Sequence, residues 1–154
     1  MRVLTIRSAR SLPAEIRVLA EAAEAEKFLA IERLVANWDS GTNRFNRDGE
    51  VFFTARTHEK LIGCCGLNMD PYVTDPRIGR VRHLYVLPEH RRSGVATQLL
   101  RHIVATAYGV FDTLRLRSHL AEAGHFYRSI GFVESSSDTH THLLNLRSSE
   151  FEPI

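Results

Sequence analysis

The segment spanning residues 83–99, HLYVLPEHRRSGVATQL, constrains the fold more than any other stretch of the chain. It begins with an apolar run typical of a strand and ends with apolar residues spaced as on one face of a helix. The strand is followed by LPEH, and only the short turn RRSG then separates it from the helix. A strand that passes so directly into a helix leaves the first backbone N–H groups of the helix without partners, and the helix dipole adds about half a positive charge there. The segment therefore predicts an anion site built from main chain.

The residue types in this turn fit such a site. Gly94 removes the side chain that would keep an anion away, and Ala96 keeps the next turn slim. Arg91 and Arg92 add positive charge at the rim. The turn is neither a P-loop nor a dinucleotide-binding motif, because G-x-x-x-x-G-K-[ST] and G-x-G-x-x-G are both absent. The alternative reading is that Gly94 only turns the chain and that the arginines are solvated.

Composition sets the wider limits. The chain has 154 residues, 44% of them hydrophobic and 25% charged, which is typical of one globular domain, taken as residues 1–154. A net charge of +2 does not favour nucleic acid as a partner, and no apolar stretch is long enough to predict a membrane span. The N-terminus lacks the pattern of a secretory signal, so we expect a cytoplasmic protein. The adjacent Cys64 and Cys65 should point to opposite faces of a strand and act as small core residues.

Hydrophobic periodicity and turn signals predict the element order β-α-α-β-β-β-α-β-α-β-β. The expected strands are residues 2–8, 50–57, 60–68, 80–87, 112–118, 132–136 and 141–146. The expected helices are residues 11–20, 22–35, 94–107 and 121–131. This order implies an α+β fold with a mixed, mostly antiparallel sheet of about seven strands, a central β-α-β crossover and helices on both faces.

Two motifs in the second half of the chain point to a family. The run LYVLPEHRRSGVATQLL resembles the acetyl-CoA-binding motif of the GNAT superfamily of N-acetyltransferases, with Arg91, Gly94 and Ala96 at the defining positions. The run AGHFYRSIGFVE resembles the second motif of that superfamily, A-x-x-F-Y-x-x-x-G-F. Its matching residues are Ala123, Phe126, Tyr127, Gly131 and Phe132. The predicted order of elements is also that of the superfamily.

The resemblance implies acetyl-CoA as the cofactor. It places the pyrophosphate on the backbone amides of residues 92–97 and pairs the pantetheine arm with the strand at residues 84–86. The amide of Leu84 would polarise the thioester carbonyl, and Tyr127 would protonate the departing thiolate. The alternative for Tyr127 is a core aromatic on a short amphipathic helix. Leu120 stands where relatives often carry an asparagine that contacts the cofactor arm. The residues expected to bind the cofactor are Leu84, Tyr85, Val86, Arg91, Arg92, Ser93, Gly94, Val95, Ala96, Thr97, Phe126 and Tyr127.

The resemblance does not supply a general base. Many relatives place Glu or His two and four residues before the position of Leu84, where this chain has Arg82 and Arg80. Arginine cannot act as a base at neutral pH. His83 is adjacent, but strand alternation turns it to the other face unless a bulge intervenes. His119 and Asp70 are further candidates, and a chain of water molecules is an alternative to a dedicated base.

The same two arginines suggest the acceptor. Guanidinium groups near the acceptor site would repel a polyamine and attract a carboxylate or phosphate, so Arg80 and Arg82 are predicted to bind a small amine that carries an anionic group. The alternative is that both pair with acids of the sheet itself, such as Glu50 or Asp70. The loops at residues 38–49 and 69–78 are expected to wall this acceptor site.

Other clusters carry less information. His140 and His142 share one strand face, but no further ligand motif completes a metal site, so no metal is predicted. Arg115 and Arg117 alternate with leucines, which is the ordinary pattern of a half-exposed strand. The arginines are not interleaved with stacking aromatic residues, as a nucleic-acid module would need.

Two functions from different classes remain. The first is an acetyl-CoA-dependent N-acetyltransferase that acts on a small amine by direct attack in a ternary complex. The second is a non-catalytic acyl-CoA-binding or regulatory domain of the same fold. The resemblance also suggests a homodimer, although no surface of the sequence identifies the interface.

Overall fold

The computed structural model describes residues 3–118, 120 and 123–147. The order of elements is the predicted one, with one added 3-10 turn at Pro88–His90, called η1. The helices are α1 (Ile16–Ala25), α2 (Ala30–Ser40), α3 (Val95–Ala107) and α4 (Ala123–Ile130). The strands are β1 (Leu4–Ser8), β2 (Val51–Thr57), β3 (Lys60–Met69), β4 (Ile78–Val86), β5 (Thr113–Leu116), β6 (Val133–Glu134) and β7 (His142–Asn145).

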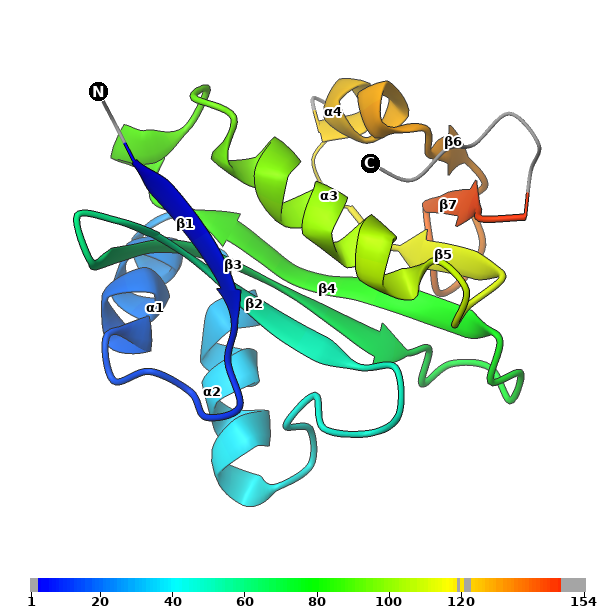
Figure 1. The fold of residues 1–154 in the computed structure, drawn as a ribbon, viewed down its shortest axis with the longest axis horizontal. Coiled ribbons are helices and arrows are strands. Elements are labelled where there is room, and N and C mark those ends of the chain that lie inside the picture. The colour runs from blue at the N-terminus through cyan, green and yellow to red at the C-terminus, as the bar shows by residue number, and fades with distance from the viewer. Residues whose placement is uncertain (1–2, 119, 121–122, 148–154) are drawn as a thin grey trace.

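The strands form one seven-stranded sheet in the order β1-β2-β3-β4-β5-β7-β6. All neighbours are antiparallel except β4 and β5, which α3 joins in a parallel crossover. Helix α3 crosses one face of the sheet, and α1 and α2 cover the other face (Figure 1). The predicted α+β fold with a mixed, mostly antiparallel sheet is therefore confirmed.

The core lies between the sheet and its helices. The predicted apolar face of α3 is fully buried on β2, β3 and β4, with Leu99, Leu100 and Ile103 at 0% exposure. Cys64 and Cys65 are free and buried as predicted, and burial raises the pKa of the Cys64 thiol to about 12. Both cysteines are therefore inert core residues.

The boundaries of the first two helices differ from the prediction. Apolar spacing was expected to end the first helix near residue 20, but Ala23 continues its buried face and α1 runs to residue 25. The chain then breaks at Lys27, whose φ of 62° lies in the left-handed region. Phe28 leaves the helical stripe to stack on Tyr85, with ring centroids 5.9 Å apart and an interplanar angle of 14°. This ring contact joins residues far apart in sequence. With the chain broken here, α2 begins at Ala30, eight residues later than predicted.

Two irregularities in β4 shape the centre of the sheet. The register between β3 and β4 shifts between Cys64 and Gly66, and His83 has a φ of 60°, which together mark a β-bulge. On its other side β4 pairs with β5 only from Ile78 to Arg80. Beyond Arg80 the two strands part, so the second half of β4 has no pairing partner on β5.

Candidate active site

The bulge frees backbone groups at the centre of β4. The register with β3 pairs Tyr85 with Cys64 and Arg82 with Gly66, which leaves His83 and Leu84 without a partner residue. Leu84 is half-buried against the core and lies on the part of β4 that has separated from β5. The strand edge predicted to pair with an extended ligand is therefore present, and so is the bulge on which the placement of His83 depends.

The N-terminus of α3 has the geometry expected of an anion site. Gly94 precedes the helix with a φ of 89°, and no side chain caps the first turn. A Cβ built on Gly94 would meet no atom within 4 Å, so the space beside this residue, directly before the first turn of α3, is open. Arg92 and Ser93 are exposed at the rim. The open space and the uncapped amides fit a phosphate group, because such amides carry the positive end of the helix dipole.

Arg91 makes a different contribution from Arg92. Its guanidinium binds the carboxylate of Glu26 in a bidentate pair, with N–O distances of 2.9 and 2.7 Å, and its Nε donates to the carbonyl oxygen of Val86 at 2.9 Å. Tyr85 donates its hydroxyl to the same carboxylate at 2.6 Å. Hydrogen bonds from Arg91 and then Tyr85 lower the pKa of Glu26. Arg91 therefore fixes the turn to the end of α1 while Arg92 remains at the rim.

Tyr127 projects from α4 into an aromatic cluster. Its ring lies 5.2 Å from Phe126, 5.9 Å from Phe132 and 5.6 Å from His142, measured between centroids. Burial raises the pKa of the Tyr127 phenol, and the thiol of Cys65 adds to the effect. The phenol is therefore protonated at neutral pH. It interacts with Cys65 of β3, the strand that pairs with β4 on either side of the bulge.

A cavity of about 360 Å³ opens beside the other end of the bulge. The loops at residues 38–49 and 69–78, which were expected to surround the acceptor site, line this cavity, and Arg82 is the one residue of β4 on its surface. Arg82 makes no hydrogen bond or ion pair with the described residues. The lining residues are Asn37, Gly41, Thr42, Asn43, Arg44, Asn46, Arg47, Glu50, Asn68, Met69, Pro71, Tyr72 and Arg82.

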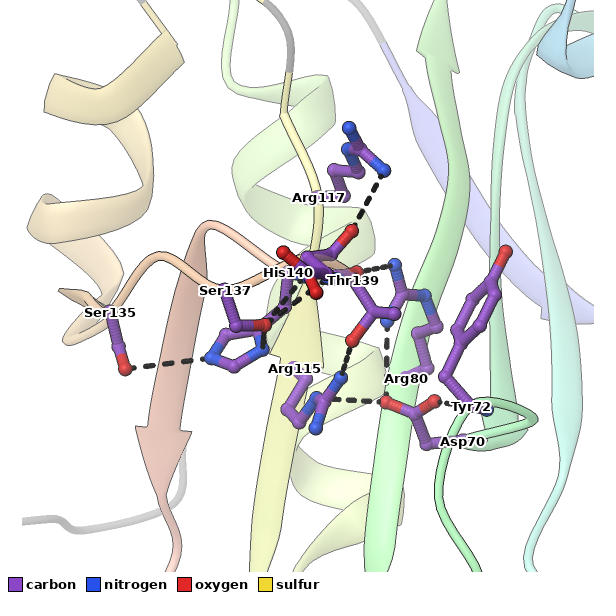
Figure 2. A network of polar contacts seen from close by, with 10 residues as sticks. Asp70, Tyr72, Arg80, Arg115, Arg117, Ser135, Ser137, Thr139 and His140 are labelled. Atoms are coloured by element: carbon purple, nitrogen blue, oxygen red, sulfur yellow. Dashed lines mark hydrogen bonds and ion pairs between the residues drawn. The ribbon is translucent and has the colours of Figure 1, made fainter.

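Arg80 has a different environment from Arg82. Its guanidinium lies 3.3 Å from the carboxylate of Asp70 and donates to the carbonyl oxygen of Thr139 at 2.5 Å (Figure 2). The Asp70 side chain is 0% exposed, and Arg115 approaches it at 3.0 Å. Burial lowers the pKa of Arg80, and Asp70 opposes this effect. Arg80 therefore pairs with an acid of the protein itself and is not free to bind the acceptor, as the alternative reading had it. Arg82 stays open to the cavity.

The candidate bases are placed as follows. The bulge turns His83 onto the ring of Phe45, 6.1 Å between centroids, on the face where Arg82 lies. Burial, followed by the charge of Arg82, lowers the pKa of His83 to about 3, so its imidazole is neutral at physiological pH. Neither ring nitrogen has a hydrogen-bond partner among the described residues. Asp70 is engaged by two arginines, and His119 lies outside the described residues.

Sequence reasoning missed the role of β5. Arg115 donates to the hydroxyl of Thr139 at 2.5 Å, and Arg117 donates to the carbonyl oxygen of Asp138 at 3.3 Å. The parallel register sets Arg115 beside Arg80. The signal was present, because arginines alternate on both strands, but only the pairing of β4 with β5 shows that the two alternations share one face.

The histidines of the C-terminal strand pair have ordinary partners. His140 contacts Ser137 at 2.6 Å and Ser135 at 3.4 Å, and His142 lies 2.9 Å from the hydroxyl of Thr141. In the part of the chain that the structure describes, no group of three or more metal-binding side chains converges. In the same part, no helix is both long and apolar enough to cross a bilayer.

Comparison with known proteins agrees with this geometry. Residues 48–134 match the family model of the acetyltransferase (GNAT) domain. A protein from Exiguobacterium sp. 255-15, described as an acetyltransferase, is 32% identical, with 93% of each chain covered and a TM-score of 0.84. None of the curated proteins matches the sequence.

More distant structures share the fold alone. The ribosomal-protein-S18-alanine N-acetyltransferase of Escherichia coli is 18% identical, with 96% of each chain covered and a TM-score of 0.68. N-acetylglutamate synthase of Neisseria gonorrhoeae, solved with coenzyme A and N-acetyl-glutamate, is 17% identical with a TM-score of 0.68, covering 95% of this chain and 36% of that one. The family model covers more than half of the chain, and the fold agrees throughout. This chain therefore belongs to the GNAT acetyltransferase family, whose enzymes take their acetyl group from acetyl-CoA.

Proposed function

We propose that this chain transfers an acetyl group from acetyl-CoA to the primary amine of a small acceptor that carries a carboxylate. One observation carries the proposal. The bulged segment at residues 82–86 runs without a β5 partner from the cavity that holds Arg82 to the turn before α3. A single strand edge thus connects a site suited to an anionic acceptor with a site suited to a pyrophosphate.

The chain offers a continuous path for the cofactor. The amides of residues 92–97 would hold the pyrophosphate, since the first turn of α3 is uncapped and Gly94 leaves its approach open. The free edge at residues 84–86 would pair with the amide groups of the pantetheine arm, as an added strand does. Phe126, half-buried on α4, would pack against the arm from the opposite side.

The residues around the bulge suit direct transfer. Acetyl-CoA supplies the acetyl group as a thioester, whose C–S bond breaks as the C–N bond to the acceptor amine forms. The N–H of Leu84 would donate a hydrogen bond to the carbonyl oxygen as negative charge develops on it. Tyr127 would give its phenolic proton to the departing thiolate and recover one from solvent, since its raised pKa keeps it protonated beforehand.

The acceptor ammonium must lose one proton before its nitrogen can attack, and the nitrogen loses a second as the amide forms, so these protons need another route. His83 is a weak base, because its pKa of about 3 disfavours protonation. Glu50 lines the cavity, but one of its oxygens accepts from Asn68 at 3.0 Å and from the amide of Met69 at 2.9 Å. We propose that water in the open cavity carries these protons to solvent, the route that the sequence left as an alternative.

Arg82 is the residue that would select the acceptor. It is half-buried in the cavity and has no acidic partner among the described residues, so a carboxylate would gain a charge-assisted, bidentate contact there. The same charge would repel an unsubstituted polyamine. The free, buried Cys64 and Cys65 are in keeping with a reducing compartment, and we place the reaction in the cytoplasm.

Thiol release from acetyl-CoA, measured with a panel of amines, tests this proposal. We expect amines that carry a carboxylate to be the best acceptors and Arg82→Ala to lower their kcat/KM by about 10- to 100-fold, the worth of one hydrogen-bonded ion pair. Polyamines or peptide lysines as the best acceptors, with Arg82→Ala unchanged, would contradict it.

The second candidate is a non-catalytic acyl-CoA-binding domain. The observation that favours it is the environment of the candidate bases, since His83 has a depressed pKa and Asp70 is held by two arginines. Calorimetric titration with acetyl-CoA separates the two functions when it is combined with the amine panel. Tight binding of acetyl-CoA without turnover on any amine would establish the non-catalytic acyl-CoA-binding domain.

A further inference from the structure

Four arginines lie together where β4 and β5 part. Arg80 and Arg115 are direct neighbours in the parallel register. Arg82 follows two residues later on β4, and Arg117 lies one residue beyond the end of β5. We call these four residues the arginine cluster. Because β4 and β5 separate just beyond the first pair, Arg82 and Arg117 lie on the two sides of the opening between the strands.

The inner pair of the arginine cluster is structural. Arg80 and Arg115 share the carboxylate of Asp70, and both donate to Thr139 in the loop between β6 and β7 (Figure 2). Their side chains are 6% and 11% exposed. The ring of Tyr72 covers the Arg80 guanidinium at 4.6 Å. These contacts bind the end of β3, β4, β5 and the β6–β7 loop into one wall.

The outer pair is available to a ligand. Arg82 lines the cavity and makes no hydrogen bond or ion pair with the described residues. Arg117 is exposed, and its contact with the described residues is a single hydrogen bond of 3.3 Å to the carbonyl oxygen of Asp138. A main-chain carbonyl leaves most of the donors of a guanidinium unused, because arginine carries five.

The local charge is not balanced by the protein. The arginine cluster carries four positive charges, and Asp70 is the one carboxylate in contact with it among the described residues. Glu50 is the one acidic side chain on the cavity surface, where Arg44 and Arg47 add further positive charge. His140 contributes none at neutral pH, since burial, Arg115 and Arg80 lower its pKa. The site therefore has an excess of at least two positive charges, which an anionic ligand would neutralise.

We propose that the acceptor is a dianionic amine, with one acid group on Arg82 and a second acid group that reaches Arg117 across the opening between β4 and β5. The inference rests on the proposed function and specifies its substrate class. An amine with two carboxylates and an amine with one carboxylate and one phosphate monoester share this chemistry. A neutral or singly charged amine would leave one of the two outer arginines without a partner.

A series of paired acceptors, each pair differing by one acid group, tests the proposal by kcat/KM. The dicarboxylic arm is aspartate and glutamate, with asparagine and glutamine as the matched monoanions. The phosphate arm is O-phosphoserine, with serine as its matched control. We expect the better dianion to exceed its matched monoanion by about 10- to 100-fold, the effect of one hydrogen-bonded ion pair. The arm that shows this preference identifies the second acid group.

Variants assign the preference to residues. Arg117→Gln should abolish the preference for the dianion over its matched monoanion and leave the KM for acetyl-CoA unchanged. Arg82→Gln should lower kcat/KM for both acceptors. The control is Arg101→Gln, an exposed position on α3, which covers the opposite face of the sheet, and it should change neither value.

The outcomes separate this proposal from the proposed function. If monoanionic amines are acetylated as well as dianions, transfer to carboxylated amines stands and the dianion proposal is wrong. If no amine is acetylated, the binding of aspartate, glutamate and O-phosphoserine to the coenzyme A complex is measured by calorimetry against the same matched controls. A preference of less than about threefold in that measurement would also overturn the dianion proposal, whether or not the chain is catalytic.

Discussion

Replacing Gly94 by alanine separates the stability of the turn from its role in binding. The backbone of Gly94 has a φ of 89°, where an L-residue costs about 1–2 kcal/mol. A Cβ at this position meets no protein atom within 4 Å, so the protein itself adds no steric cost. The methyl group would instead enter the open space at the N-terminus of α3, where we expect the phosphate to bind. Displacing one charge-assisted hydrogen bond to a phosphate is worth about 1.5–3 kcal/mol, or about a 10- to 150-fold loss of affinity for coenzyme A.

The chain contains a matched control at the other end of the same helix. Gly109 has a φ of 86°, and a Cβ there also meets no atom within 4 Å. Gly109→Ala should therefore lower the free energy of unfolding by the same 1–2 kcal/mol, roughly, while leaving coenzyme A affinity unchanged. Urea unfolding measures the first quantity and calorimetric titration with coenzyme A the second. Equal affinities in Gly94→Ala and Gly109→Ala would refute the account of the α3 N-terminus as the phosphate site.

Three further predictions concern other parts of the site. Tyr127→Phe should lower kcat by about 100-fold with little change in the KM for acetyl-CoA, since a general acid contributes to the transfer step; an unchanged kcat in thiol-release assays would remove Tyr127 from the reaction. Glu26→Gln should lower the free energy of unfolding, measured with urea, by at most about 1 kcal/mol, because both side chains of its pair with Arg91 are more than a third exposed. A larger loss would contradict the view that this ion pair is a weak surface contact. The depressed pKa of His83 means that the folded state binds its proton less readily than the unfolded state, so stability is full above about pH 6.5 and falls below it by up to about 1.4 kcal/mol per pH unit. Urea unfolding at pH 7, 5.5 and 4.5 should show a shallower fall in His83→Gln, and equal slopes would contradict the burial argument.

The sequence predicts most of the fold because its signals are local. Helix α3 and the hairpin of β2 and β3 have strong periodicity and clear turn residues, and the structure has them within two residues of the predicted bounds. The break between α1 and α2 was not predictable in the same way. It depends on Phe28 stacking on Tyr85 from a distant strand, a contact that no window of neighbouring residues contains.

The candidate site likewise combines features that local sequence predicts with features that depend on tertiary packing. The backbone groups of the turn before α3 follow from the strand-turn-helix pattern alone. The separate roles of Arg80 and Arg82 depend instead on Asp70 and on where β4 leaves β5, which are matters of tertiary packing. The position of His83 follows from the bulge, which strand alternation cannot locate. Homodimer formation and the single domain at residues 1–154 stay predictions.

Acceptor-dependent release of coenzyme A, with the acetylated amine identified by mass spectrometry, is the direct test of acetyl transfer to a carboxylated amine. We expect wild-type protein to form equal amounts of free thiol and N-acetylated product with a carboxylated amine. We also expect the rate to fall sharply in both Tyr127→Phe and Arg82→Ala. Saturable binding of acetyl-CoA with no acetylated product from any amine in the panel would contradict this expectation, and the chain would then be a binding domain of this family.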